Sequence, residues 1–351
     1  MNILSIDTSC DETAAAVTSG RRVLSNVVYS QIPIHEKWGG VVPSLAKRAH
    51  EERIDEVVKK ALKHTPLETI GAIAVTQGPG LAIALGVGIE KAKELARLWN
   101  KPLIGINHLE GHLYSVFAQN SNGNPHTAIT FPYLAMIISG GHTEFVLWKG
   151  HLSYTLLGAT LDDAAGEALD KAGKLLGLGY PAGAVIERLA SEIDNVDIFR
   201  FPRPMAHSKD LAFSFSGLKT AFYYHIKEMS KDDIHKHVRH LASSFQEAVF
   251  DTIVIKAEKA IKQTGVNRMV IGGGVAANAY LRKKMRALTK KYEGSVVFPS
   301  GKKLTGDNAA MIGIAAWPYA ERKLWSNPAT LERQPRMKLI SSCNNENNRL
   351  N

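Results

Sequence analysis

Two histidines four residues apart, His108 and His112, directly follow the apolar run 103–106. Residues i and i+4 lie on one face of a helix, so both imidazoles can reach one metal ion. Two nitrogen ligands leave a divalent ion under-coordinated, and Asp307 is the best candidate for a third ligand. A bare His-x-x-x-His pair is as readily two structural histidines, so both interpretations stay open at this point. Glu110 does not directly follow His108, as the base of a zincin peptidase would, and it is a poor general base.

Two glycine-rich turns have the composition of anion-binding loops. The first, 139–143, follows an apolar strand, and its glycines would let backbone N–H groups approach an anion closely. A tight turn between two strands explains the same residues equally well. The second, 272–274, follows a strand and opens a helix, where Asn278 is placed to read a polar edge of a nucleotide. It lacks the full dinucleotide fingerprint, which argues against a Rossmann cofactor.

Acidic residues gather at two places. Asp7, Asp11 and Glu12 share one strand and loop, where they could orient a metal-bound water or a nucleophile, or form a solvated acidic loop. The run 162–167 favours a helix dipole, which accounts for most of its acidic residues. Asp170 falls on roughly the same face as Asp162 and could accept hydrogen bonds from a ribose.

The elements that would position these residues alternate between strands and helices. Strands are predicted at 3–6, 23–29, 70–75 and 103–106, with a long helix at 44–63, which indicates an α/β fold with a parallel or mixed sheet. A turn-rich break at 120–125 ends this pattern. Beyond it, 135–140 resembles 4–9, so we expect a duplicated fold with a cleft between its halves. The region 161–261 is mostly helical, a last helix runs over about 308–322, and 340–351 is predicted to be a disordered tail.

Composition narrows the partners. The formal net charge of +10 and the isoelectric point near 9.4 favour an anionic partner, nucleic acid before membrane. The two cysteines, Cys10 and Cys343, do not suggest a disulfide framework. No apolar run approaches the length that spans a membrane, and we expect a cytoplasmic protein.

Taken together, the motifs resemble those of the tRNA N6-adenosine threonylcarbamoyltransferases, formerly described as O-sialoglycoprotein endopeptidases. The resemblance extends over 3–339 and is closest to the bacterial branch. The segments that carry it are SIDTSCDET at 5–13, GGVVP at 39–43, QGPGL at 77–81, NHLEGH at 107–112, SGGHT at 139–143, DDAAGE at 162–167, FSGLK at 215–219 and TGDN at 305–308.

The resemblance implies an actin-like (ASKHA) duplicated fold, with two ribonuclease H-like lobes at 1–127 and 128–339, a central cleft and a helical insertion at about 161–261. It implies a metal ion on His108, His112 and Asp307, a ligand set that suits Fe²⁺ and Zn²⁺ alike. We expect Asp11 and Glu12 to be catalytic, by orienting the acceptor or handling its proton. Adenylate-binding positions would be Ile138, Ser139, Gly140, Gly141, His142, Asp170, Gly183 and Asn278.

The implied reaction moves a threonylcarbamoyl group from threonylcarbamoyl-adenylate to N6 of adenine 37, in tRNAs that read codons starting with A. The metal in the cleft would polarise the donor. Implied partners are tRNA, an inactive paralogue as heterodimer partner, and a small P-loop ATPase. The chain departs from the family at Ala182, whose methyl could narrow the adenosine pocket, and at Ser44, where Glu is usual. The alternative from another class is an actin-like ATP-binding switch or scaffold without transferase activity.

Overall fold

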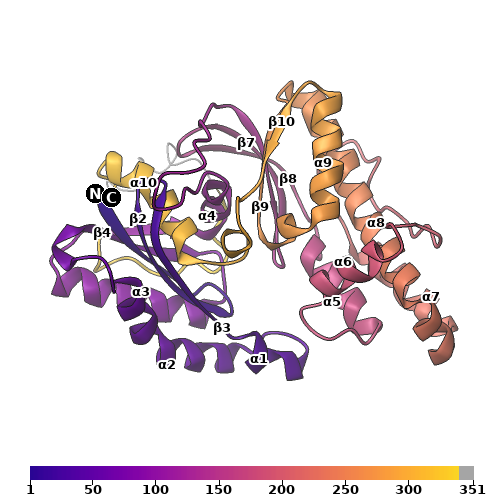
Figure 1. The fold of residues 1–351 in the computed structure, drawn as a ribbon, viewed down its shortest axis with the longest axis horizontal. Coiled ribbons are helices and arrows are strands. Elements are labelled where there is room, and N and C mark those ends of the chain that lie inside the picture. Colours follow the sequence, from indigo (N-terminus) through magenta and orange to yellow (C-terminus); the bar gives the residue numbers. More distant parts are fainter. Residues whose placement is uncertain (340–351) are drawn as a thin grey trace. The chain divides into compact units, whose positions relative to one another are not determined.

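The structure is a computed structural model, and it describes residues 1–339 of the chain (Figure 1). The predicted disordered tail 340–351 and Cys343 lie outside the described residues. Contacts divide the chain into two compact units. Unit 1 contains Met1–Thr130, Gly150–Ser153 and the residues from Pro299 onward, and unit 2 contains Phe131–Lys149 and Tyr154–Phe298. The lobe limits 1–127 and 128–339 did not include this return of the chain to unit 1, and they stay a prediction.

Unit 1 is built on a five-stranded mixed sheet with the order β3-β2-β1-β4-β5. Strand β1 at its centre pairs antiparallel with β2 and parallel with β4, and β4 pairs parallel with β5. The strands are β1 Asn2–Asp7, β2 Glu12–Ser19, β3 Arg22–Ser30, β4 Ile70–Gly78 and β5 Leu103–Asn107.

Helices cover both faces of this sheet, because its strands are apolar on both sides. Side chains alternate between the faces of a strand, and in β2 Ala15 and Val17 pack with α2 (Pro43–Ala61) and α3 (Ala82–Leu98). Their neighbours Ala14 and Ala16 pack instead against the start of α10 (Ala309–Glu321). The residues of α10 are therefore held directly over the centre of the sheet, as is visible in Figure 1.

Unit 2 repeats this arrangement. Its sheet has the order β10-β9-β6-β7-β8, in which the first strand, β6, again pairs antiparallel with the next strand and parallel with a strand from much later in the unit. Read from its other edge, the order is the same as in unit 1. The duplicated α/β fold expected from the sequence is thus confirmed. The strands are β6 Tyr133–Ile138, β7 Thr143–Gly150, β8 Ser153–Ala159, β9 Arg268–Gly272 and β10 Ser295–Val297.

The helices of unit 2 supply most of its core, where one cluster joins the apolar side chains of β6 to those of α5 through α9. The longest helix, α8, begins where Ser230 accepts a hydrogen bond from the backbone of Asp233, and it ends at Gly265, whose φ of 68° is left-handed. The remaining helices of the chain are α1 Ile32–His35, α4 His108–Ser115, α5 Ala165–Leu175, α6 Gly183–Ser191, α7 Ser216–Glu228, α8 Lys231–Thr264 and α9 Ala279–Lys291, with short 3₁₀ turns at Glu36–Trp38, Leu67–Thr69, Gly274–Ala277 and Lys302–Leu304.

Three details differ from the sequence prediction. The strands Glu12–Ser19 and β8 were not predicted, and Glu12, which had been placed in a loop, begins the first of them. Helix α5 begins only at Ala165, so Asp162 precedes the helix and does not share a helical face with Asp170. Within residues 1–339, no helix combines the length and the apolar character that crossing a bilayer requires.

Candidate functional site

The histidine pair lies at the start of α4, directly after β5. Asn107 caps this helix by accepting a hydrogen bond from the backbone N–H of Leu109, at 2.8 Å, so His108 takes the first helical position. Both histidines are buried. The sequence prediction that one helix carries both imidazoles on one face is confirmed.

Helix α10 brings the carboxylate to these imidazoles. Asp307 stands two residues before α10, and Asn308 between them caps the helix by accepting from the backbone N–H of Met311. The close approach of α10 to α4 depends on Gly111, since a Cβ there would lie 2.9 Å from Ile312 Cδ1 and 3.0 Å from Met311 Cγ. This contact between α4 and α10 brings Asp307 next to histidines that lie nearly two hundred residues earlier in the sequence.

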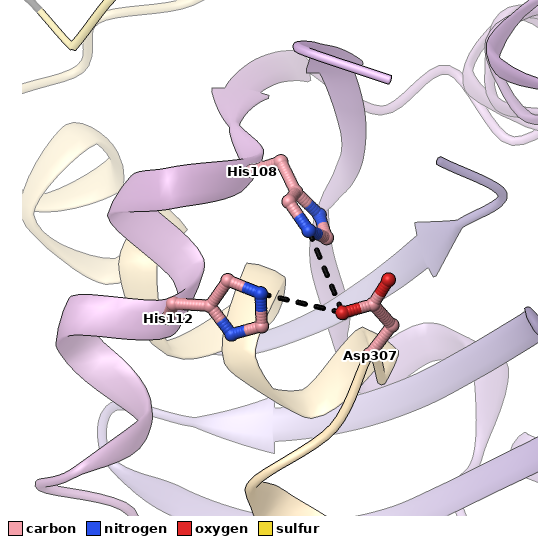
Figure 2. A group of neighbouring side chains, drawn as sticks. All are labelled: His108, His112 and Asp307. Atoms are coloured by element: carbon pink, nitrogen blue, oxygen red, sulfur yellow. Dashed lines mark ion pairs between the residues drawn. The ribbon is translucent and has the colours of Figure 1, made fainter. Parts of the chain in front are cut away.

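Figure 2 shows the resulting cluster, in which one carboxylate oxygen faces both rings. Asp307 Oδ1 lies 3.5 Å from His108 Nε2 and 3.3 Å from His112 Nε2. Tetrahedral ligands at about 2.1 Å from a zinc ion are about 3.4 Å apart, so both distances match the edge of such a polyhedron. Ligand atoms of all three residues lie within 4.8 Å of one another.

Polar atoms left without hydrogen bonds also indicate that a ligand belongs here. Among the described residues, neither ring nitrogen of His112 has a hydrogen-bond partner, and the same is true of His108 Nδ1 and Asp7 Oδ2. Buried polar groups are nearly always paired, because an unpaired one costs about 1–3 kcal/mol. Two imidazoles and a carboxylate are a donor set that Zn²⁺ and Fe²⁺ both accept. The residues therefore fit a divalent metal ion.

The charges of the cluster shift its ionisation strongly. Burial works to lower the pKa of His108, but the negative charges of Asp307 and Asp7 outweigh it and raise the pKa to about 9. Burial opposes ionisation of Asp307 as well, yet His108 and His112 hold the pKa of that carboxyl well below its usual range. In the metal-free protein the site is thus an ion pair, and a metal ion would replace the His108 proton.

Asp11 lies in the turn between β1 and β2, and Glu12 is the first residue of β2, in the same unit as this cluster. Burial raises the pKa of Glu12 well above its usual value, and the charges of Asp307 and Asp11 add to the effect. Glu12 therefore holds its proton more tightly than an exposed glutamate does. Burial likewise raises the pKa of the Cys10 thiol, followed by the charge of Asp11, so this cysteine is not a poised nucleophile.

Glu110, which a peptidase would use as its general base, is engaged in a contact with α10. Its carboxylate is buried and accepts a hydrogen bond of 2.8 Å from the hydroxyl of Tyr319. This contact joins α4 to α10, so the role seen for Glu110 is structural.

The remaining candidate residues lie in unit 2, around the ends of β6 and β9. The turn 139–142 is closed by hydrogen bonds between Ser139 and His142, and a Cβ at Gly140 or Gly141 would meet no atom within 4 Å. The glycine turn after β9 packs directly on it, because a Cβ at Gly273 would lie 2.4 Å from the carbonyl oxygen of Ile138. Both glycine turns thus lie together at the carboxyl ends of parallel strands, where ligands bind in open α/β sheets.

Gly166 is a residue of this site that the sequence reasoning missed. A Cβ there would lie 2.6 Å from the carbonyl oxygen of Ser139, and its backbone N–H donates to that oxygen at 3.2 Å. The glycine therefore lets α5 approach the turn. Its place inside the acidic run 162–167 was the available signal.

Three predicted contacts of the adenylate are already engaged within the protein. Asp170 Oδ1 accepts from the backbone N–H groups of Ala182, at 2.8 Å, and of Gly183, at 3.3 Å, which places it at the start of α6. Asn278 caps α9 by accepting from the backbone of Leu281, and its amide donates to Gln246. The contact of these residues with a nucleotide stays a prediction.

The structure also explains two features of the sequence. The methyl of Ala182 is buried against α5, where a Cβ at Gly173 would lie 2.0 Å from it, so it is accommodated by that glycine. Asp162 accepts hydrogen bonds from the backbone and hydroxyl of Ser216, at 3.2 and 2.8 Å, and so secures the start of α7. The acidic run 162–167 and the segment 215–219 are therefore joined by hydrogen bonds.

Comparison with known proteins agrees with this picture. The sequence model of the tRNA N6-adenosine threonylcarbamoyltransferases matches residues 22–314. A relative of that name from Anaeromyxobacter sp. (strain Fw109-5) is 49% identical over 318 residues, which cover 90% of this chain and 93% of that one. Another of that name, from Thermosipho africanus (strain TCF52B), is 45% identical over 341 residues, which cover 97% and 100%.

Solved structures with similar folds are far more distant in sequence. The activator of 2-hydroxyisocaproyl-CoA dehydratase from Clostridium difficile, with bound ADPNP, has a TM-score of 0.53 at 15% identity, over 93% of this chain and 99% of that one. Full-length HypF, in a phosphate- and nucleotide-bound form, has a TM-score of 0.56 at 15% identity, over 93% and 56%. These likenesses concern the fold alone, and they agree with the actin-like fold expected from the sequence.

Proposed function

Because the chain belongs to the tRNA N6-adenosine threonylcarbamoyltransferase family, we propose that it transfers a threonylcarbamoyl group from threonylcarbamoyl-adenylate to N6 of adenine 37 in tRNAs that read codons starting with A, releasing AMP. The observation that carries the proposal is the family match over 22–314, together with 49% identity over 90% of the chain. By its family the protein is a transferase, and the family name indicates tRNA as its substrate.

In this reaction the N6 amine of adenine attacks the carbonyl carbon of the donor. The bond between that carbon and the phosphate oxygen breaks, and one proton leaves the amine. The donor is a mixed anhydride and already activated, so the enzyme needs no nucleophile of its own. Its task is to position a weakly nucleophilic amine and to stabilise the charge that develops on the carbonyl and phosphate oxygens.

His108, His112 and Asp307 would hold one Fe²⁺ or Zn²⁺ ion, which would supply Lewis-acid polarisation of the donor carbonyl. Their side chains are preorganised for this, since helix packing through Gly111 fixes both ligand-bearing elements. The fit of the ligand distances to a tetrahedral edge supports this role.

The glycine turns of unit 2 would hold the adenylate. Gly140 and Gly141 present backbone at an exposed turn, at which an anion can be bound by N–H groups. Ile138, Ser139, His142, Asp170, Gly183 and Asn278 complete the predicted donor site. Asp11 and Glu12 are proposed to handle the acceptor: Asp11 would accept the proton of the N6 amine, and Glu12, whose pKa is raised by burial, would orient that amine by a hydrogen bond.

The net charge of +10 suits an acceptor as strongly anionic as tRNA. We propose a cytoplasmic enzyme that works with an inactive paralogue, as a heterodimer, and with a small P-loop ATPase. The proposal of these partners is based on the family relationship. It is tested by comparing the transferase activity of the isolated chain with that of the chain mixed with both partners.

The test is mass spectrometry of nucleosides from an unmodified tRNA incubated with this protein, its partners and threonylcarbamoyl-adenylate. We expect N6-threonylcarbamoyladenosine at position 37, and its loss in Asp307→Ala. A tRNA with another base at position 37 is the matched control and should stay unmodified. ATP binding by the protein, with no product from any tRNA, would contradict the proposal and would favour an actin-like nucleotide switch.

A further inference from the structure

Two of the unpaired polar atoms around the histidines face each other. Asp7 Oδ2 and His108 Nδ1 are 3.8 Å apart, and among the described residues neither has a hydrogen-bond partner. Asp7 is completely buried, and the ring of His108 is largely buried. A fully buried carboxylate oxygen that accepts no hydrogen bond lowers the stability of the folded protein. The position of this oxygen beside a histidine therefore calls for an explanation.

Asp7 is held rigidly, so the direction of Oδ2 is determined by the fold. Its other oxygen, Oδ1, accepts hydrogen bonds from the backbone N–H of Ser9, at 3.1 Å, and from the hydroxyl of Thr76, at 2.8 Å. Asp7 ends β1, the central strand of the sheet, which is paired on both sides. Both donors lie on the Oδ1 side, which leaves only Oδ2 for His108.

The two nitrogens of the His108 ring face different carboxylates. Nε2 lies 3.5 Å from Asp307 Oδ1, inside the candidate metal cluster, whereas Nδ1 faces Asp7. Asp7 is not among the residues whose ligand atoms gather there, so it is not a fourth ligand. A carboxylate across the ring from a metal ion is the usual partner of a metal-binding histidine, because it fixes which nitrogen keeps the proton.

We propose that Asp7 is a positioning residue whose Oδ2 accepts a hydrogen bond from the Nδ1–H of His108 and thereby presents Nε2 to the metal ion. The inference rests on the metal role in the proposed function. A shift of about 1 Å, which metal loading at Nε2 can bring about, would turn the contact of 3.8 Å into a hydrogen bond. Of the two histidines, His108 would then be the one whose tautomer the protein sets.

Asp7→Asn tests this with little change in shape. The amide oxygen must take the place of Oδ1, since the backbone N–H of Ser9 donates there. The amide NH₂ then faces His108 Nδ1, which can accept from it only without a proton. The neutral ring would keep its proton on Nε2, the atom that the metal needs.

The measurement is the dissociation constant of Zn²⁺ for the metal-free protein, by competition with a chromophoric chelator. We expect Asp7→Asn to weaken binding by about 10–100-fold. Asp11→Asn is the matched control: it is the same change in the turn after β1, and none of its described interactions reaches His108, so binding should change by less than about threefold. In a His108→Ala background, Asp7→Asn should have no further effect.

Imidazole ¹⁵N spectra give a second measurement, which needs no Asp7 variant. In the Zn²⁺-loaded wild-type protein, the His108 signal, identified by its loss in His108→Ala, should show a proton on Nδ1 that exchanges slowly with water. Zn²⁺ on Nδ1, unchanged affinity in Asp7→Asn, or an equal loss of affinity in the His108→Ala background would overturn the inference. Failure of the wild-type protein to bind Zn²⁺ or Fe²⁺ would instead overturn the proposed metal role.

Discussion

Without metal, the protein should lose stability as the pH rises from neutral to alkaline, because a buried imidazolium is part of its fold. Burial lowers the pKa of His108, but Asp307 and Asp7 outweigh it and raise that pKa from 6.5 to about 9 in the folded protein. A raised pKa contributes stability that is fully present below the unfolded value, here 6.5, and is lost as the pH passes through about 9.

The size of the effect follows from the shift. The difference between 6.5 and about 9, at 1.36 kcal/mol per pKa unit, corresponds to about 3 kcal/mol of unfolding free energy. Asp307→Asn removes the charge that raises the pKa of His108 most, so the variant should lose less than half as much over the same range. Asp11→Asn keeps the cluster intact and, once Cys10 and Glu12 are replaced, should lose as much stability as the parent protein.

The assay is urea denaturation with a strong chelator present, at pH values of about 6 and about 10, on either side of the transition. The quantity compared is the drop in unfolding free energy between the two, in wild type and in each variant. Equal drops in wild type and Asp307→Asn would refute the reasoning, as would a wild-type protein whose stability does not fall. Burial and the charges of Asp307 and Asp11 also raise the pKa values of Cys10 and Glu12, so all proteins are compared in a Cys10→Ala, Glu12→Gln background, from which both groups are absent.

Three glycine substitutions test the packing that builds the two sites. Gly111→Val should cost about 1–3 kcal/mol in urea denaturation and weaken Zn²⁺ binding severalfold, since its Cβ would meet Ile312 Cδ1 at 2.9 Å. Gly273→Ala should cost about 2 kcal/mol or more in the same assay, because φ is 96° and the Cβ would lie 2.4 Å from the carbonyl oxygen of Ile138. Gly140→Ala meets no atom within 4 Å and should leave stability within about 0.5 kcal/mol. Its KM for threonylcarbamoyl-adenylate should nevertheless rise, and an unchanged KM would remove this turn from the donor site.

The grouping of His108, His112 and Asp307 was predictable in part, because the histidine pair follows local rules. The spacing of His108 and His112 needs only a helix, and Asn107 supplies the cap that starts it there. Asp307 could be chosen from its motif. What the sequence could not show is how α10 reaches α4, since that depends on the absence of a Cβ at Gly111 and on the side chains that pack there.

The structural roles of the acidic run 162–167 were harder to predict, because they depend on contacts with residues far away in the sequence. Asp162 was assigned to a helix start, yet it secures the first turn of α7, some fifty residues later. Gly166 had no visible role until the turn after β6 was placed against α5. Asn278 caps the helix that it begins, whereas Asp170 accepts a hydrogen bond from the backbone of Ala182, twelve residues later, and the sequence pattern did not indicate either role.

The central claim is that a metal ion on His108, His112 and Asp307 is required for transfer, and one titration tests it. Metal-free protein is loaded stepwise with Fe²⁺ or Zn²⁺, and bound metal and N6-threonylcarbamoyladenosine formed on tRNA are measured in the same samples. We expect product to rise in proportion to bound metal, up to one ion per chain. The variant His112→Ala should neither bind the metal nor form the product. Full transfer by the metal-free protein would contradict the account.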